Sequence, residues 1–172
     1  SQVVPYPYRP QLPVVREYQT LLKKYAPDAE VNYTSFEQFL GAKVLVEALR
    51  LNPSMSAIYA GYSDGAFILV RPLNTLEQHQ LFSAPREARF VVQSVERQGG
   101  LVQGHFLFLD DALTLLERRN RPDYRYDPRG RPWYQEALKS GVGIQTNPYV
   151  FFTTQEVGQT IASRSQRGGA VV

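Results

Sequence analysis

The chain contains no cysteine, and this absence removes several kinds of chemistry at once. Without a thiol there can be no disulfide, no thiolate metal ligand and no cysteine nucleophile. Histidine is almost as scarce, since His79 and His105 are the only two and lie far apart in the sequence. A histidine-based metal site is therefore an unattractive interpretation, and we expect neither a metal nor a cofactor.

Long apolar runs are missing as well. The stretch at residues 66–70 is typical of the longest ones, far below the roughly 18 residues that a membrane helix requires. Residues 1–4 show no basic segment followed by an apolar stretch, so we expect no signal peptide. Any membrane anchor is then expected outside these 172 residues.

What the chain does contain favours a folded domain with a mixed core. Hydrophobic residues make up 43% and charged residues 20%, which is enough apolar surface to build a core. The 11 Tyr and 9 Phe against a single Trp suit half-buried strands and a polar-rimmed pocket.

Six arginines lie between residues 118 and 131, together with only two carboxylates, Asp123 and Asp127. Because proline and aspartate interrupt this basic stretch, we interpret it as a solvated loop and expect no nucleic-acid partner.

The first fifty residues carry helical patterns. Apolar residues recur at helical spacing before Pro27, at Val14, Tyr18, Leu21, Leu22 and Tyr25. Thr34 with Glu37 forms a capping box for a second helix that runs to Arg50. That second helix is apolar over most of its circumference, so it should be buried on two sides. We predict that its residues 35–50 pack on a sheet formed by the rest of the chain.

The remaining residues carry strand patterns. Two hairpins are predicted, 56–62 with 66–71 and 88–97 with 101–109, and a third joins 148–153 to 158–165. Asp110 or Asp111 is expected to cap a short helix reaching Arg119, and Pro132 to open another through Leu138. Residues 170–172 read as a further strand. The predicted fold class is α+β, with domains at residues 1–50 and 51–172.

Residues 52–172 resemble the extracytoplasmic Cache sensor domains of bacterial receptors, which precede cyclase, kinase or chemoreceptor modules. The run Tyr126-Asp127-Pro128-Arg129-Gly130-Arg131-Pro132-Trp133-Tyr134 is the most specific part. Residues 57–62, 67–71 and 149–154 support the resemblance. It implies a PAS-like fold, with a central antiparallel sheet, a long N-terminal helix and a ligand pocket under a helical flap.

Residues 3–50 resemble a different family, the periplasmic binding proteins of branched-chain amino-acid ABC transporters. The matching text lies at residues 3–7, 12–18, 35–37 and 41–49. In that family it forms a strand exit and two helices of a larger two-lobed protein. A solute-binding component of an ABC transporter is therefore one alternative function. Another is a hybrid chain without binding function, whether a natural fusion, an assembly artefact or an engineered chimera.

The candidate ligand site groups a cation with aromatic side chains. Arg131 offers a planar fork of donors that matches a carboxylate, and Trp133 offers an indole N–H with a large apolar face. Further hydroxyls and aromatic walls come from Tyr126, Tyr134 and Tyr149. The Cache resemblance implies that Tyr126, Arg131, Trp133 and Tyr134 hold the carboxylate of an amino acid. By position, the aspartate that those receptors use for the ammonium group follows residue 172.

A purely structural interpretation of the same residues stays open. Arg131 could instead pair with Asp127 or Asp123, and Trp133 could be a core residue. Asp110-Asp111 fits a helix cap better than an acid–base dyad. Because no catalytic constellation is recognisable, we predict a sensor rather than an enzyme. Its ligand would be an amino acid or small carboxylate, its location periplasmic, and a homodimer is a candidate assembly.

Overall fold

A computed structural model describes the chain except residues 1–6, 26–29, 32, 99, 141 and 166–169, and except the side chains of residues 25, 33–40, 42 and 98. The chain forms two compact units, residues 1–51 and 52–172. Within the described part, no helix is both long enough and apolar enough to cross a bilayer.

The first unit holds helices α1 (Pro13–Tyr25) and α2 (Tyr33–Leu51), as the sequence predicts. On α1, Val15 and Tyr18 are buried against Leu22 and Val31. The side chains of the predicted capping box at residues 34 and 37 lie outside the described ones. The packing of residues 35–50 on the sheet stays a prediction.

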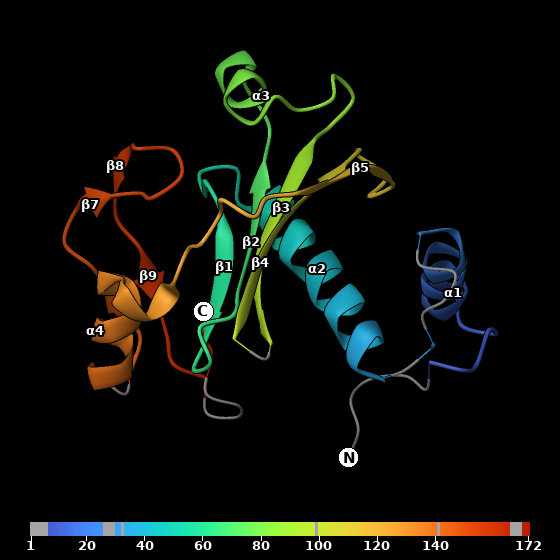
Figure 1. Cartoon of the computed structure of the whole chain (residues 1–172), viewed down its shortest axis with the longest axis horizontal. Helices are drawn as coiled ribbons and strands as arrows, with labels where there is room; N and C mark the ends of the chain where they lie inside the picture. Colours follow the sequence, from blue (N-terminus) through green and yellow to red (C-terminus); the bar gives the residue numbers. More distant parts are fainter. Residues whose placement is uncertain (1–6, 26–29, 32, 99, 141, 166–169) are drawn as a thin grey trace. The chain divides into compact units, whose positions relative to one another are not determined.

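The second unit is built on one six-stranded antiparallel sheet, which confirms the predicted α+β class (Figure 1). Its strands follow the order β10-β1-β2-β3-β4-β5. Their bounds are Ile58–Tyr62 (β1), Phe67–Pro72 (β2), Phe90–Gln98 (β3), Leu101–Leu109 (β4), Leu115–Asn120 (β5) and Ala170–Val171 (β10).

The first two predicted hairpins are confirmed, because β1 pairs with β2 and β3 with β4. The first turn closes on Gly65, whose φ of +86° favours glycine. Within the same turn, Asp64 Oδ1 accepts a hydrogen bond from the Ala66 N–H at 2.8 Å. This combination of Asp and Gly explains why the turn was recognisable from the sequence.

The predicted helix from Asp110 to Arg119 is wrong, since this segment forms strand β5. Asp110 does act as a cap, but it caps a tight turn by accepting from the Thr114 N–H at 2.7 Å. Leu113 adopts a left-handed φ of 63° in that turn. The chain therefore reverses and pairs with β4, and β5 shows alternating burial, the period of a strand.

The third predicted hairpin is only partly right. Strand β7 (Tyr149–Val150) pairs with β8 (Val157–Gly158), as expected around the turn at 154–157. Strand β9 (Ile161–Ala162), however, pairs with β6 (Ile144–Gln145), so the long second arm is divided between two small sheets. Helix α3 (Leu76–Phe82) was missed, although Thr75 and Gln78 form a complete capping box before it.

One face of the large sheet carries the core and is covered by the loop after β5. This loop contains the 3-10 turn η1 (Pro128–Gly130) and leads into α4 (Pro132–Ser140), the short helix predicted at Pro132. Helix α4 contacts β6, β9 and β10, and η1 contacts β1. The buried cluster comprises Phe67, Leu69, Leu73, Phe82, Ala88, Val91, Val95, Phe106, Phe108, Tyr124, Tyr126, Trp133, Tyr134, Ala137, Ala162 and Val171.

Candidate functional site

The loop before α4 is fixed by its own hydrogen bonds. Asp127 caps η1, because its Oδ1 accepts from the Arg129 N–H at 3.0 Å. The Arg131 N–H then donates to the Pro128 carbonyl at 2.9 Å, and Pro132 occupies the first position of α4. Arg131 and Trp133 therefore leave the backbone on either side of a residue with a restricted φ.

Trp133 and Tyr126 form one unit at the centre of the core. Trp133 is 0% exposed and Tyr126 8% exposed, and the indole Nε1 donates to the Tyr126 hydroxyl at 3.2 Å. Around them, Tyr59 packs edge-on against Trp133 at 4.9 Å between ring centroids, and Phe67 lies 4.3 Å from Tyr126. The structural interpretation of Trp133 as a core residue is thus correct for its ring.

Arg131 lies between two aromatic rings. Its guanidinium carbon is 5.9 Å from the centroid of Tyr126 and 5.7 Å from that of Tyr149, within range of cation–π attraction. One terminal nitrogen donates to the Val150 carbonyl at 3.0 Å, whereas its buried Nε has no hydrogen-bond partner among the described residues. The guanidinium therefore carries one N–H donor without an acceptor among the described residues.

The alternative ion pairs of Arg131 are not formed. Asp127 pairs with Arg129 at 2.7 Å, and Asp123 pairs with Arg121 at 2.7 Å. These hydrogen-bonded arginines hold the pKa of both aspartates below the usual range. The carboxylates that could have neutralised Arg131 are therefore already engaged.

Tyr149 joins a hydroxyl network that sequence reasoning did not include. Its Oη lies 2.6 Å from Thr160 Oγ1, which also hydrogen-bonds to the hydroxyl of Tyr59 on β1. The Tyr59 and Tyr149 hydroxyls are 3.4 Å apart. The pattern of β1 could have suggested Tyr59, because a tyrosine on the core face of a strand needs a polar partner.

Tyr134 is the predicted residue that the structure does not bring to Arg131. Its ring meets the edge of Trp133 at 5.6 Å, and it is buried within the cluster. The pKa of Arg129 is raised, chiefly by its hydrogen bond to Asp127, and Tyr134 contributes less. Tyr126, Arg131, Trp133 and Tyr149 thus converge, and Tyr134 contacts them through the indole.

Burial extends the pH range over which the phenols of this cluster stay neutral. It raises the pKa of Tyr59, Tyr124 and Tyr126 above the usual value. For Tyr126, the hydrogen bond from Trp133 and the charge of Arg131 partly oppose this shift. Neutral phenols around one guanidinium provide hydrogen-bond donors and an aromatic wall, which suits a small anion.

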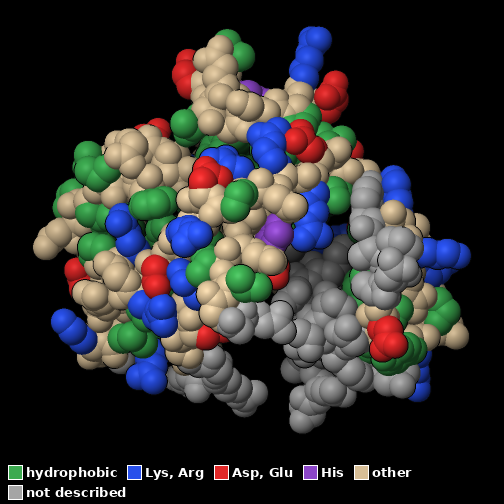
Figure 2. Space-filling model, viewed as in Figure 1, with side chains coloured by type: hydrophobic (Ala, Val, Ile, Leu, Met, Phe, Trp, Pro, Cys, Tyr) green, Lys and Arg blue, Asp and Glu red, His purple; other side chains and the backbone are tan. Residues whose placement is uncertain are grey.

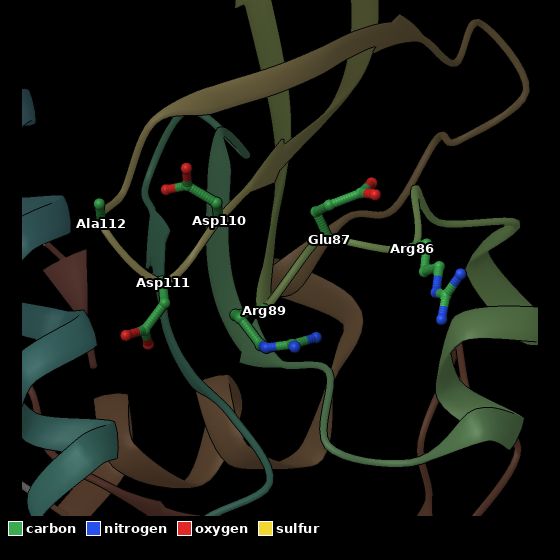
Figure 3. A pocket seen from close by; sticks show the side chains of 6 residues that line it. All are labelled: Arg86, Glu87, Arg89, Asp110, Asp111 and Ala112. Atoms are coloured by element: carbon green, nitrogen blue, oxygen red, sulfur yellow. The ribbon is translucent and has the colours of Figure 1, made fainter.

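Two surface hollows lie elsewhere on the second unit. Figure 3 shows one, about 470 Å³ in volume and lined by Arg86, Glu87, Arg89, Asp110, Asp111 and Ala112. The other lies beside α3, between Leu73 and Arg89. The first mixes two arginines with three carboxylates, which does not favour an ion of either sign. Neither hollow contains a predicted ligand residue.

The described residues offer neither a metal site nor a concentrated basic surface. They contain no group of three His, Asp or Glu that could hold a metal ion. In the basic stretch, Arg119, Arg121 and Arg129 each pair with a carboxylate at 2.7 Å. Figure 2 shows basic and acidic side chains interspersed on the visible face rather than gathered in one basic patch.

Comparisons with known proteins place similar sequences in signalling proteins. Adenylate cyclase 1 of Rhizobium meliloti is 35% identical over 126 residues, 73% of this chain and 19% of the cyclase. The chemotaxis proteins McpB of Bacillus subtilis and PctB of Pseudomonas aeruginosa are 48% and 46% identical over 48 and 44 residues, about a quarter of this chain and 7% of each receptor.

The chain therefore spans at most about a fifth of the length of these relatives. No family model and no solved structure matches it. The similarity to segments of a cyclase and of chemotaxis receptors fits a sensor domain of a signalling receptor.

Proposed function

We propose that residues 52–172 are the extracytoplasmic sensor domain of a bacterial receptor, of the Cache type, and that they bind an amino acid or another small carboxylate. The observation that carries this proposal is the guanidinium of Arg131, held between the rings of Tyr126 and Tyr149 with a buried, unpartnered Nε. A carboxylate would supply the missing acceptor, and the arginine fork suits it.

The role proposed for each residue follows from its contacts. Arg131 binds the ligand carboxylate, and the hydroxyls of Tyr126 and Tyr149 donate further hydrogen bonds to that carboxylate. Trp133 supports the site with its ring, because its N–H is already donated to Tyr126. The domain would act by binding alone, without a catalytic step or a cofactor, and would pass its signal to segments beyond this chain.

The relatives support a sensor over the solute-binding alternative. The names of the matched proteins are those of a cyclase and two chemotaxis receptors. A periplasmic location on the outer side of an inner membrane would follow from that role, as part of the proposal. The resemblance of residues 3–50 to transport proteins stays a prediction, and a second lobe would be needed to form their cleft.

Isothermal titration calorimetry of the 172-residue protein against the amino acids and small organic acids tests this function. We expect at least one carboxylate to bind, and Arg131→Ala to weaken its binding by a factor of about 30 or more. Arg131→Lys should also bind more weakly, since an ammonium lacks the fork. The matched control is Arg125→Ala, an exposed arginine of the same loop. Binding that survives Arg131→Ala unchanged, or no carboxylate ligand at all, would refute the proposal.

A further inference from the structure

Two polar side chains are buried on the core face of the sheet, and polar atoms of both lack hydrogen-bond partners. Arg71 on β2 is 4% exposed, and Gln93 on β3 is 0% exposed. Neither the amide nitrogen nor the amide oxygen of Gln93 has a hydrogen-bond partner among the described residues, and the same holds for the Nε of Arg71. Arg71 also forms no ion pair with any residue that the structure describes.

The strand register places both side chains on the same face as the aromatic cluster. Gln93 lies opposite Leu69 on one side and Phe106 on the other, and Leu69 lies opposite Tyr59. Arg71 lies opposite Val91, two residues along the same face. Directly opposite residues of an antiparallel pair share a face, so the side chains of Arg71 and Gln93 project into the interior that Tyr124 and Tyr126 cover.

The positive charge of Arg71 lies next to an aromatic ring and has no carboxylate in an ion pair with it among the described residues. Its guanidinium carbon is 6.0 Å from the ring centroid of Phe82. Burial lowers the pKa of Arg71, and the charge of Glu156 partly opposes this shift. Tyr59 and Tyr124, whose own pKa values are raised by burial, are neutral at ordinary pH, so they do not neutralise the guanidinium. None of the three hydrogen-bonds to it. A buried cation and a buried amide without partners are costly in the unliganded protein, which makes them candidates for contacts with a ligand.

Ring contacts connect Arg71 and Arg131 through the buried aromatic cluster. Arg71 lies over the ring of Phe82, which packs edge-on against Phe106 at 6.0 Å between ring centroids. Phe106 packs edge-on against Tyr124 at 5.1 Å between ring centroids, and Tyr124 stacks at 6.2 Å against Tyr126, the ring beside Arg131. Both guanidinium groups therefore border one buried aromatic cluster.

We infer that Arg71 and Gln93 bind a second, anionic group of the ligand, so that the domain prefers an amino acid or small acid with two carboxylates. This inference rests on the proposed function, in which Arg131 holds the first carboxylate. One buried cation beside a neutral amide matches a single negative charge, as in a carboxylate, better than the double charge of a phosphate. The Gln93 amide would donate to the carboxylate oxygen that Arg71 leaves free.

The test compares isosteric ligands by calorimetry: L-glutamate with L-glutamine, and L-aspartate with L-asparagine. We expect the wild-type protein to bind at least one acidic member about tenfold or more tightly than its amide. Arg71→Met should remove this preference while binding of the amide persists, and Gln93→Leu should reduce the preference. The matched control, Arg118→Met, changes an exposed arginine of the same sheet and should leave the preference intact.

The outcomes separate this inference from the proposed function. Binding of amino acids through Arg131 with no preference for a second carboxylate would overturn the inference alone. An absence of any carboxylate ligand would overturn both. The melting temperature of the unliganded protein is a second measurement. If Arg71 lacks an internal partner, Arg71→Met should leave it equal or higher. A large fall would show that a partner such as Glu156 satisfies the guanidinium, and would also overturn the inference.

Discussion

The indole of Trp133 donates its only N–H to the hydroxyl of Tyr126, at 3.2 Å, inside a buried aromatic cluster. From the sequence, this N–H is a candidate donor to a ligand, with a core role for Trp133 as the alternative. Because the bond is internal, Trp133 can offer a ligand only its ring, whereas Tyr126 keeps its own O–H as a donor. The same two residues therefore belong both to the core and to the candidate site, so a change in either should affect the stability of the protein.

Replacing Tyr126 with phenylalanine tests this connection. The change keeps the ring but removes the acceptor, and a buried N–H left without a partner costs about 1–3 kcal/mol. We expect the free energy of unfolding in denaturant, followed by circular dichroism, to fall by that amount. Tyr62→Phe, at an exposed position of β1, is the control. A change in Tyr126→Phe as small as in this control would show that the hydrogen bond does not stabilise the core.

A second prediction concerns Gly61 on β1, which allows the strand to approach the loop. A methyl group at this position would lie 2.6 Å from Pro128 Cβ and 2.9 Å from the indole of Trp133. Gly61→Ala should therefore destabilise the protein by about 1–3 kcal/mol, the range for overpacking, and shift the fluorescence of the single tryptophan.

Gly130 provides the control for this substitution. It lies in the same region, and a Cβ there would meet nothing within 4 Å. Gly130→Ala should change neither the stability nor the emission spectrum appreciably. Equal effects of the two substitutions would mean that close packing at Gly61 is not the cause.

The elements that were predictable from sequence are those whose signals are local. The turn at Gly65 and the start of α4 at Pro132 each depend on residues with restricted or unusual φ, so a few neighbours specify them. Strand β5 was mistaken for a helix because Asp110 caps a turn and a helix in the same way, and only the pairing with β4 distinguishes the two.

The candidate site depends on local and on long-range signals in the same way. Tyr126, Arg131 and Trp133 lie within eight residues, and the cap at Asp127 and the following helix fix their relation locally. Arg71 and Gln93, which we propose for a second anionic group, share a face with the aromatic cluster only through strand register, over sequence separations that no short motif encodes. Arginine and glutamine are mostly exposed in proteins, so a sequence pattern gives no sign that Arg71 and Gln93 are buried.

A third prediction concerns Arg97 on β3, which holds the turn of the first hairpin and the site loop together. Its Nε donates to the Gly65 carbonyl at 2.9 Å, and a terminal nitrogen donates to the Tyr126 carbonyl at 3.2 Å. The ion pair with Asp127, at 3.5 Å and between partly exposed side chains, should add little. Arg97→Ala should lower the free energy of unfolding by about 1.5–3 kcal/mol, as for hydrogen bonds from a charged donor.

Arg97→Lys should recover only part of this loss, because an ammonium cannot reach both carbonyls with the geometry of the fork. Thermal and denaturant unfolding of both variants, beside the exposed Arg118→Ala, would measure the difference. If lysine restored full stability, charge rather than directed hydrogen bonding would explain the role of Arg97.

The last prediction uses the buried phenols. Burial raises the pKa of Tyr59, Tyr124 and Tyr126, so the folded state binds these protons more tightly than the unfolded chain, in which tyrosines titrate near pH 10. Their contribution to stability is complete below that pH and is lost as the pH rises through the folded values. In an alkaline titration of tyrosinate absorbance, some of the 11 tyrosines should ionise only when circular dichroism shows unfolding, whereas all should ionise near pH 10 in denaturant. Reversible ionisation of every tyrosine near pH 10 in the folded protein would show that the cluster admits water and hydroxide, and that its phenols are not the desolvated donors on which the proposed site depends.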